Sequence, residues 1–352
     1  MKSAFRVPLG PMTTLGIGGV AARVDEVASD DELLEVVRRC AANDEPLAVI
    51  GGGSNLIVPD EGFPGTVLRL GQRSIAVRRD GDVVQVSVGA GCNWGELVAT
   101  ACDAGWAGLE CLAGIPGSVG AAPIQNIGAY GQEVGDSIES VRFFDRKAGR
   151  FDSWTAAECA FAYRDSRFKR QGHAIVTEVN FRFASTGLSK PLRYAELLGA
   201  LGASDGAACS LVTVARTVEA LRRKKGMVID AADPDSRSAG SFFVNPILNE
   251  RALGEFLTIL DRDGLPKPTI FPASGTSKKV PAAWLIEKAG FVKGETHGAF
   301  RISTKHALAL VHLGGGSSAE LLVFAQRIVD GVRERFGITL EREPVYLTAE
   351  RA

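Results

Sequence analysis

The chain has 352 residues, 45% of them hydrophobic, and its 40 basic and 41 acidic side chains leave a formal net charge of −1. This length allows two or three domains, and the balanced charge argues against a nucleic-acid partner. No apolar run is long enough to cross a bilayer and no apolar leader begins the chain, so we expect a cytoplasmic protein without membrane insertion.

The cysteines and histidines do not indicate a disulfide framework or a metal site. Six cysteines are scattered without a Cys-x-x-Cys pair, which predicts reduced, half-buried thiols. His306 and His312 fall on one expected strand with no carboxylate beside them at ligand spacing. We interpret both as core or surface residues and predict no metal. Nothing in the sequence requires an oligomer.

The first elements end at a glycine-rich segment. A short strand is expected over Ala22–Val27, and Ser29 with Glu32 forms a capping box for a helix over about Asp31–Ala42. The buried strand Pro46–Ile50 then stops at Gly51-Gly52-Gly53-Ser54-Asn55-Leu56.

That segment offers consecutive backbone N–H groups and two side-chain donors, an arrangement that suits a pyrophosphate. It is not a Walker A loop, because no Gly-Lys-Ser/Thr follows. It also differs from the Gly-x-Gly-x-x-Gly motif, because strand-forming residues follow in place of a helix. An ordinary tight turn remains an equal interpretation.

The middle of the chain predicts a second sheet and a second glycine-rich segment. Expected strands cover Thr66–Leu70, Ile75–Arg79, Val83–Val88, Ile138–Asp145, Arg150–Trp154 and His173–Phe183, with a helix over Trp94–Ala104. The segment from Gly114 to Gly131 holds many glycines and almost no charge. It predicts either a main-chain wall against a phosphate-bearing cofactor or a buried crossover between layers.

A helix from Ser210 to about Lys225 ends in Arg222-Arg223-Lys224-Lys225. These cations suit either a helix C-terminus or a phosphate on a substrate, and spacing alone favours the helix C-terminus. Asp230–Arg237 is expected to be a polar linker, with a domain boundary near Gly226. In Gly240-Ser241-Phe242-Phe243, two aromatic residues would exclude water around the Ser241 hydroxyl; a buried hydroxyl bonded to backbone is the alternative.

The last part of the chain predicts three helices: one over Glu250–Asp261, one that starts at Trp284, and one that is capped by Ser317 with Glu320. It also predicts a strand over Ala307–Val311 and a strand-like tail over 338–347.

Six segments in this order resemble the UDP-N-acetylenolpyruvoylglucosamine reductase (MurB) family from Thr14 to Val345. They are Gly51–Asn55, Gly114–Gly117, Gln125–Gly131, Tyr163–Ser166, Gly240–Phe243 and Glu341–Pro344. The resemblance implies an α+β fold: a two-domain FAD-binding cradle of the vanillyl-alcohol oxidase/PCMH type plus a third α+β substrate-binding domain. The implied domains are 1–72, joined by the C-terminal strand 338–352, then 73–225 and 226–337.

The resemblance also implies non-covalent FAD, with NADPH as reductant and a nucleotide-sugar substrate in peptidoglycan synthesis. The implied FAD-binding residues are Ile50, Gly51, Gly52, Gly53, Ser54, Asn55, Leu56, Gly114, Ile115, Pro116, Gly117, Ser118, Gly120, Asn126, Gly128, Ala129, Tyr130 and Val176.

By the same resemblance, Arg164 stabilises negative charge on the enolpyruvyl carboxylate, Ser241 is the general acid, and Glu343 is the carboxyl group that works with Arg164. Spacing alone cannot separate Glu343 from Glu341. The implied substrate-binding residues are Tyr194, Arg222, Lys225, Asn245 and Lys288. Two positions depart from the family pattern: Val244 stands where some relatives have lysine, and Lys288 where others have glutamine.

Two other functions stay open at this stage. One is a sugar or alcohol oxidase on the same cradle, in which His or Cys often tethers FAD; no His lies between residues 51 and 131, and the candidates there are Cys92 and Cys111. The other is a flavin-free module that binds nucleotide sugars. The absorption spectrum of the purified protein separates these possibilities.

Overall fold

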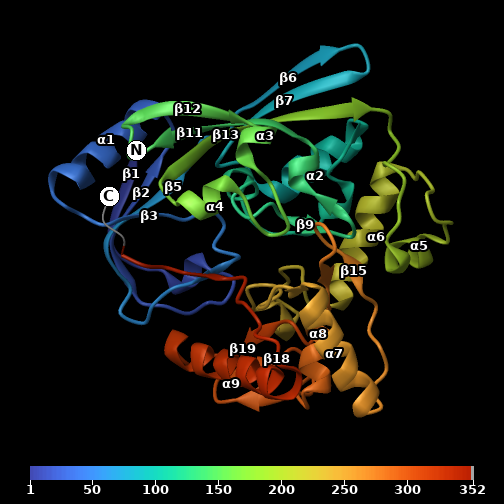
Figure 1. Ribbon diagram of the computed structural model, residues 1–352. Coiled ribbons are helices and arrows are strands. Elements are labelled where there is room, and N and C mark those ends of the chain that lie inside the picture. Colours follow the sequence, from blue (N-terminus) through green and yellow to red (C-terminus); the bar gives the residue numbers. More distant parts are fainter. Residues whose placement is uncertain (350–352) are drawn as a thin grey trace.

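The computed structural model describes residues 1–349, and its elements form three bodies (Figure 1). The first, blue in Figure 1, is the sheet β1-β2-β5-β3 with the helix α1. Its bounds are Lys2–Pro8 (β1), Val20–Val27 (β2), Asp30–Ala42 (α1), Leu47–Val49 (β3) and Phe63–Leu70 (β5). Strand β1 was missed by the sequence analysis because most of its side chains are exposed and show no alternation.

Helix α1 joins the first body to the second. The Ser29 side chain accepts a hydrogen bond from the N–H of Glu32 and starts the helix as expected. Its apolar face packs in one core cluster with Phe144 and Ile175 of the second body. The two bodies therefore share buried surface, which holds them in a defined relation without a partner molecule.

The second body is a six-stranded sheet in which β13 pairs with β11, β7 and β8. Its strands are Ile75–Asp80 (β6), Val83–Gly89 (β7), Trp106–Ala107 (β8), Ile138–Asp145 (β11), Arg150–Thr155 (β12) and Ala174–Ser185 (β13). Its helices are Trp94–Asp103 (α2), Ala156–Cys159 (α3), Arg167–Gln171 (α4), Ala195–Leu201 (α5) and Leu211–Lys224 (α6), and a small hairpin pairs Gly128–Ala129 (β9) with Gln132–Glu133 (β10). The hairpin β6–β7 projects from the body in Figure 1.

The third body contains small sheets and three helices. Its elements are Ile247–Leu248 (β14), Glu250–Arg262 (α7), Phe271–Pro272 (β15), Lys278–Lys279 (β16), Ala282–Lys288 (α8), Thr296–His297 (β17), Phe300–Ile302 (β18), Leu310–His312 (β19) and Ser318–Phe336 (α9). Asp60 of the first body accepts hydrogen bonds from the N–H groups of Ser318 (2.7 Å) and Ala319 (3.0 Å), and so ties α9 to that body.

The polar segment 230–237 is anchored to the third body, because Asp235 is buried, accepts hydrogen bonds from Ser303 and Thr304 and pairs with Arg301. Two other local expectations need correction. His306 and His312 do not share a strand; His306 lies in the loop before β19. In the tail, only Val345–Tyr346 (β20) is a strand, paired with Leu56–Ile57 (β4) of the first body.

The tail crosses between bodies, as its red trace shows in Figure 1. Ile338 and Leu340 pack in the core of the third body, and Leu347 packs in that of the first. Residues 350–352 of the expected C-terminal segment lie outside the described residues. Within residues 1–349, no helix has the length and apolar character needed to cross a membrane.

Candidate active site

A cavity of about 680 Å³ lies where the three bodies meet. The first body supplies residues 47–56, the second supplies residues from two loops and from α6, and the third supplies residues between 226 and 241 with His306. Glu343 of the tail completes the wall. A site assembled from such distant segments has several independent walls, which can hold different parts of one extended ligand.

The two glycine-rich segments meet backbone to backbone at one wall. A Cβ atom on Gly52 would lie 2.7 Å from the Cα of Gly117, so no side chain fits there. Gly117 itself has φ of +136°, which favours glycine. Ser54 donates a hydrogen bond to the carbonyl of Pro116 (3.1 Å) and locks the two turns together. The result is a wall of main chain that a phosphate can approach closely.

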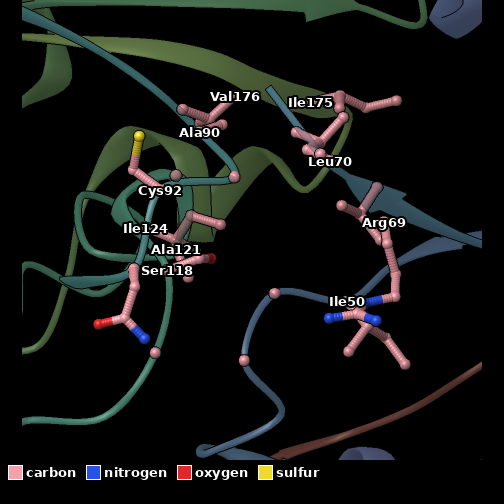
Figure 2. A pocket seen from close by; sticks show the side chains of 18 of the residues that line it. Ile50, Arg69, Leu70, Ala90, Cys92, Ser118, Ala121, Ile124, Ile175 and Val176 are labelled. Atoms are coloured by element: carbon pink, nitrogen blue, oxygen red, sulfur yellow. The ribbon is translucent and has the colours of Figure 1, made fainter. Parts of the chain in front are cut away.

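A second, smaller cavity of about 260 Å³ continues from this wall. Gly51, Gly52, Gly117 and Ser118 line both cavities. Figure 2 shows Ile50 and Arg69 on one side of the smaller cavity and Cys92, Ala121 and Ile124 on the other, with Ile175 and Val176 above them. Apolar walls beside a glycine turn suit a flat heteroaromatic ring joined to a phosphate, so the two cavities together fit a dinucleotide such as FAD.

Arg164 and Glu343 form an ion pair inside the large cavity. The Nε atom of Arg164 lies 3.0 Å from Oε1 of Glu343, and its Nη2 donates a hydrogen bond to the carbonyl of Gly128 (2.7 Å). Burial raises the pKa of Glu343, while Arg164 and Lys169 oppose the shift. Glu341 is exposed and does not line the cavity. The geometry therefore brings Glu343, and not Glu341, to Arg164.

Ser241 reaches the same cavity through a short backbone pairing with the tail. Phe243 and Arg342 form an antiparallel bridge, and the N–H of Glu343 donates to the carbonyl of Phe242 (3.0 Å). Both phenylalanines are fully buried, which fixes this loop against the core. The bridge holds the Ser241 loop against the tail that carries Glu343, and Arg164, Glu343 and Ser241 all line one cavity.

A third wall of the cavity carries cationic side chains. Arg222 is half-buried; its Nη2 donates a hydrogen bond to the carbonyl of Met227 (3.0 Å), and its buried Nε has no hydrogen-bond partner among the described residues. Burial lowers the pKa of Arg222 to about 10. Burial with nearby Lys225, Lys293 and Arg222 also lowers the pKa of His306 to about 4. A guanidinium whose buried Nε lacks a hydrogen-bond partner indicates a site for an anion.

Two tyrosines stand beside these cations. The rings of Tyr130 and Tyr194 meet edge to face at 5.2 Å, and the Nζ of Lys225 lies 5.5 Å from the centre of the Tyr130 ring. Lys225 also pairs with Glu196 (2.6 Å). Burial raises the pKa of both tyrosines, which keeps their hydroxyls protonated.

Most residues implied by the resemblance line one of the two cavities, but four do not. Asn126 is 1% exposed, and its side chain is occupied by Glu133 and by the carbonyl of Ala162. Asn245 accepts a hydrogen bond from the N–H of Ala282 (2.8 Å). Gly114 packs behind Arg222, and Lys288 is exposed at the end of α8. Gly120 and Val176 line only the smaller cavity.

The sequence analysis missed other cavity residues, including Gln125, Lys169 and His306. Gln125 donates a hydrogen bond to Glu343 (3.3 Å) and accepts one from Asn55 (2.6 Å). Its place inside the segment Gln125–Gly131 was a usable signal. No signal in the sequence pointed to His306, because its place in the cationic wall depends on residues of α6 that are distant in sequence.

Two known protein families match separate parts of the chain. Residues 21–151 match an FAD binding domain, and residues 233–347 match the C-terminal domain of UDP-N-acetylenolpyruvoylglucosamine reductase. Within residues 1–349, no group of three or more His, Cys, Asp or Glu side chains could hold a metal ion.

Relatives match along nearly the whole chain. The UDP-N-acetylenolpyruvoylglucosamine reductase of Thermobifida fusca (strain YX) is 48% identical over 347 residues, which covers 98% of each chain. That of Mycobacterium leprae (strain Br4923) is 42% identical over 354 residues, or 97% of this chain and 94% of the relative. The crystal structure of UDP-N-acetylenolpyruvylglucosamine reductase (MurB) from Thermus caldophilus matches with a TM-score of 0.66 and 28% identity over 99% of this chain and 98% of that one.

These comparisons confirm the expected fold class, an FAD-binding cradle joined to a third α+β domain, and the expectation of FAD as cofactor.

Proposed function

This chain belongs to the UDP-N-acetylenolpyruvoylglucosamine reductase family and is a flavin-dependent oxidoreductase, and we propose that it uses NADPH to reduce the enolpyruvyl ether of a UDP-N-acetylglucosamine substrate. The product would be UDP-N-acetylmuramate, a cytoplasmic precursor of peptidoglycan. The observation that supports this most directly is that the Arg164–Glu343 pair lines one cavity with Ser241, the glycine wall and the cationic wall.

The glycine wall would hold the FAD diphosphate. Residues 51–55, 117 and 118 line the cavity and would offer their main-chain N–H groups to the phosphates, and the smaller cavity would take the adenosine end between Ile50 and Val176. When bound there, FAD would accept a hydride from NADPH and pass it to the terminal carbon of the enolpyruvyl group.

Arg164 would hold the carboxylate of the substrate. Hydride addition at the terminal carbon develops negative charge on the carboxylate side, and a fixed guanidinium stabilises that charge more than it stabilises the ground state. Burial raises the pKa of Glu343, and when it is protonated this carboxyl group would donate a hydrogen bond to the same oxygens. Gln125 would help to orient this carboxyl group, since it donates to Oε1 of Glu343.

Ser241 would supply the proton that completes the reduction. The hydride forms the new C–H bond at the terminal carbon, and the proton goes to the adjacent carbon that bears the ether oxygen. A serine hydroxyl is a weak acid, but its partner would be strongly basic and carbanionic. The buried Phe242 and Phe243 hold its loop in a dry setting.

The cationic wall would bind the diphosphate of the nucleotide sugar. Arg222 and Lys225 face the cavity, and His306 lies beside them as a neutral donor because its pKa is low. Tyr194 would close the mouth over the substrate against Tyr130. The position of Lys288 gives no support for a contact with substrate.

Anaerobic mixing tests the proposal. The FAD-loaded protein should lose its visible flavin absorbance with NADPH and regain it on addition of enolpyruvyl-UDP-N-acetylglucosamine. Recovery with oxygen but not with this substrate would favour the oxidase alternative. Absence of a flavin band even after FAD is added would favour the flavin-free binding module.

A further inference from the structure

Tyr163 and Arg164 are the two central residues of a tight turn in the loop between α3 and α4. Ala162 N–H donates to the carbonyl of Asp165 (3.0 Å), and the N–H of Asp165 donates back to Ala162 (3.1 Å). Arg164 has φ of +53°, a conformation that costs a residue with a side chain on the order of 1 kcal/mol. Such a turn persists only when contacts from outside hold it.

One of these contacts comes from the third body. The Nζ of Lys279, on β16, lies 4.1 Å from the centre of the Tyr163 ring, and the guanidinium of Arg164 lies 5.3 Å from the same ring. The aromatic ring is therefore shared by two cations from different bodies. Cation–π contacts strengthen when the partners are withdrawn from water, and Lys279 and Tyr163 are both partly buried.

Asn245 adds a second contact from the third body to the same side chain. It lies close enough to the Tyr163 hydroxyl to lower the pKa of that group against the effect of burial, and its own Oδ1 accepts a hydrogen bond from the N–H of Ala282 at the start of α8. Neither Tyr163 nor Lys279 belongs to the cavity wall formed by residues 1–349. These residues therefore act behind Arg164 and do not line the space for the substrate.

We propose that Lys279 is a positioning residue: through the ring of Tyr163 it holds Arg164 in the orientation that meets the substrate carboxylate when the third body is docked. This inference rests on the proposed function. Its physical basis is the steep dependence of rate on geometry, since a displacement of about 1 Å at a reacting group can cost up to ~10²-fold.

The test compares Lys279→Met, which keeps most of the stem and loses the charge, with Lys279→Arg, which keeps a cation. Lys278→Met is the matched control, because neighbouring strand residues face opposite sides. Each FAD-loaded variant is reduced by NADPH and then reoxidised by enolpyruvyl-UDP-N-acetylglucosamine in anaerobic stopped flow. We expect Lys279→Met to slow reoxidation at saturating substrate by about tenfold. Reduction by NADPH and the substrate KM should change less than about twofold, and the other two variants should behave as wild type.

Three outcomes would overturn the proposal. If Lys279→Met raises the KM for the substrate by the same factor by which it slows reoxidation, Lys279 contacts the substrate directly. Equal slowing of both half-reactions, or failure of arginine to restore the rate, would assign it a general structural role. If Lys279→Met is reoxidised at the wild-type rate, Lys279 has no role in the reaction.

Tyr163→Leu provides the second check, because Lys279→Met should cause no further slowing in that background. Independent, multiplicative losses in the double variant would contradict action through Tyr163. If the wild-type protein itself is not reoxidised by the substrate, the proposed function fails, and this result is distinct from every outcome for Lys279.

Discussion

Arg164 and Glu343 meet as an ion pair, Nε to Oε1 at 3.0 Å, although one lies in a loop of the second body and the other in the tail of the chain. The pair exists because the tail runs antiparallel to Phe243 before it reaches the first body. The predictions below concern the chemistry and the stability of the cavity built around this contact.

Glu343 should make stability depend on pH. Its pKa is raised above the ordinary value of 4.5 by burial, so the folded protein binds this proton more tightly than the unfolded chain. The corresponding stability is fully present below pH 4.5 and is lost as pH rises through the folded pKa. Glu343→Gln removes this proton equilibrium. Thermal melts across pH 4 to 8 should show the variant gaining stability relative to wild type as pH rises; parallel curves would contradict the prediction.

Ser241→Ala should separate the two half-reactions. If the hydroxyl supplies the proton, reduction by NADPH stays near normal, and reoxidation by the enolpyruvyl substrate slows by at least ~10²-fold. Stopped-flow absorbance of the flavin measures both steps. Ser238→Ala is a useful control, since Ser238 also lines the cavity and its hydroxyl accepts a hydrogen bond from the N–H of Gly240. Equal losses in both steps for Ser241→Ala would indicate a role in binding or folding.

Arg164→Lys keeps the charge and loses the planar fork that contacts Glu343 and Gly128 together. Because a lysine cannot reproduce two-point binding of a carboxylate, reoxidation should slow by about tenfold or more, or about 1.4 kcal/mol in barrier height. Arg170→Lys, in the next helix and paired with Asp165 near the surface, is the control. Wild-type rates in Arg164→Lys would show that charge alone suffices.

Gly52→Ala should lose FAD. The added Cβ would lie 2.7 Å from the Cα of Gly117, so the two turns must separate. Gly254→Ala is the matched control because that position in α7 has open space, and alanine there should stabilise the helix by roughly 0.5–1 kcal/mol. The ratio of flavin to protein after gel filtration measures retention. Normal retention in Gly52→Ala would exclude the glycine wall as the cradle.

Arg222→Met should stabilise the protein and weaken substrate binding. It removes a guanidinium whose buried Nε has no hydrogen-bond partner within the described residues, and burying an unpaired polar group is costly. The affinity for the nucleotide sugar should fall about 10- to 100-fold, the range for hydrogen bonds to charged groups. Thermal melts and titration of the flavin spectrum measure the two effects. Lys288→Met, outside the cavity, should change neither.

The cofactor should leave the protein on acid precipitation. Cys111 is buried outside both cavities, and burial raises the pKa of the Cys92 thiol that lines the smaller one. A thiol that stays protonated is a poor nucleophile for attachment to FAD. A colourless pellet with yellow supernatant is the expected result, whereas colour kept in the pellet would support a tethered flavin.

Features whose physical causes are local could be predicted from the amino-acid sequence. Ser29, Asn93 and Ser317 each start a helix within a residue of the expected position, because a cap and its N–H partner lie three residues apart. The glycine turns were equally visible, since their conformational needs are set within a few residues. The resemblance to a known family supplied the cofactor and the roles of Arg164 and Ser241.

Which distant residues share the cavity depends on the tertiary structure. It brought Glu343 to Arg164 and left Glu341 exposed, added His306 to the cationic wall, and directed Asn245 to Tyr163 and Ala282. It also revealed the unpaired Nε of Arg222. These contacts depend on how three bodies and a crossing tail converge, and such convergence leaves no trace in the spacing of residues along the chain.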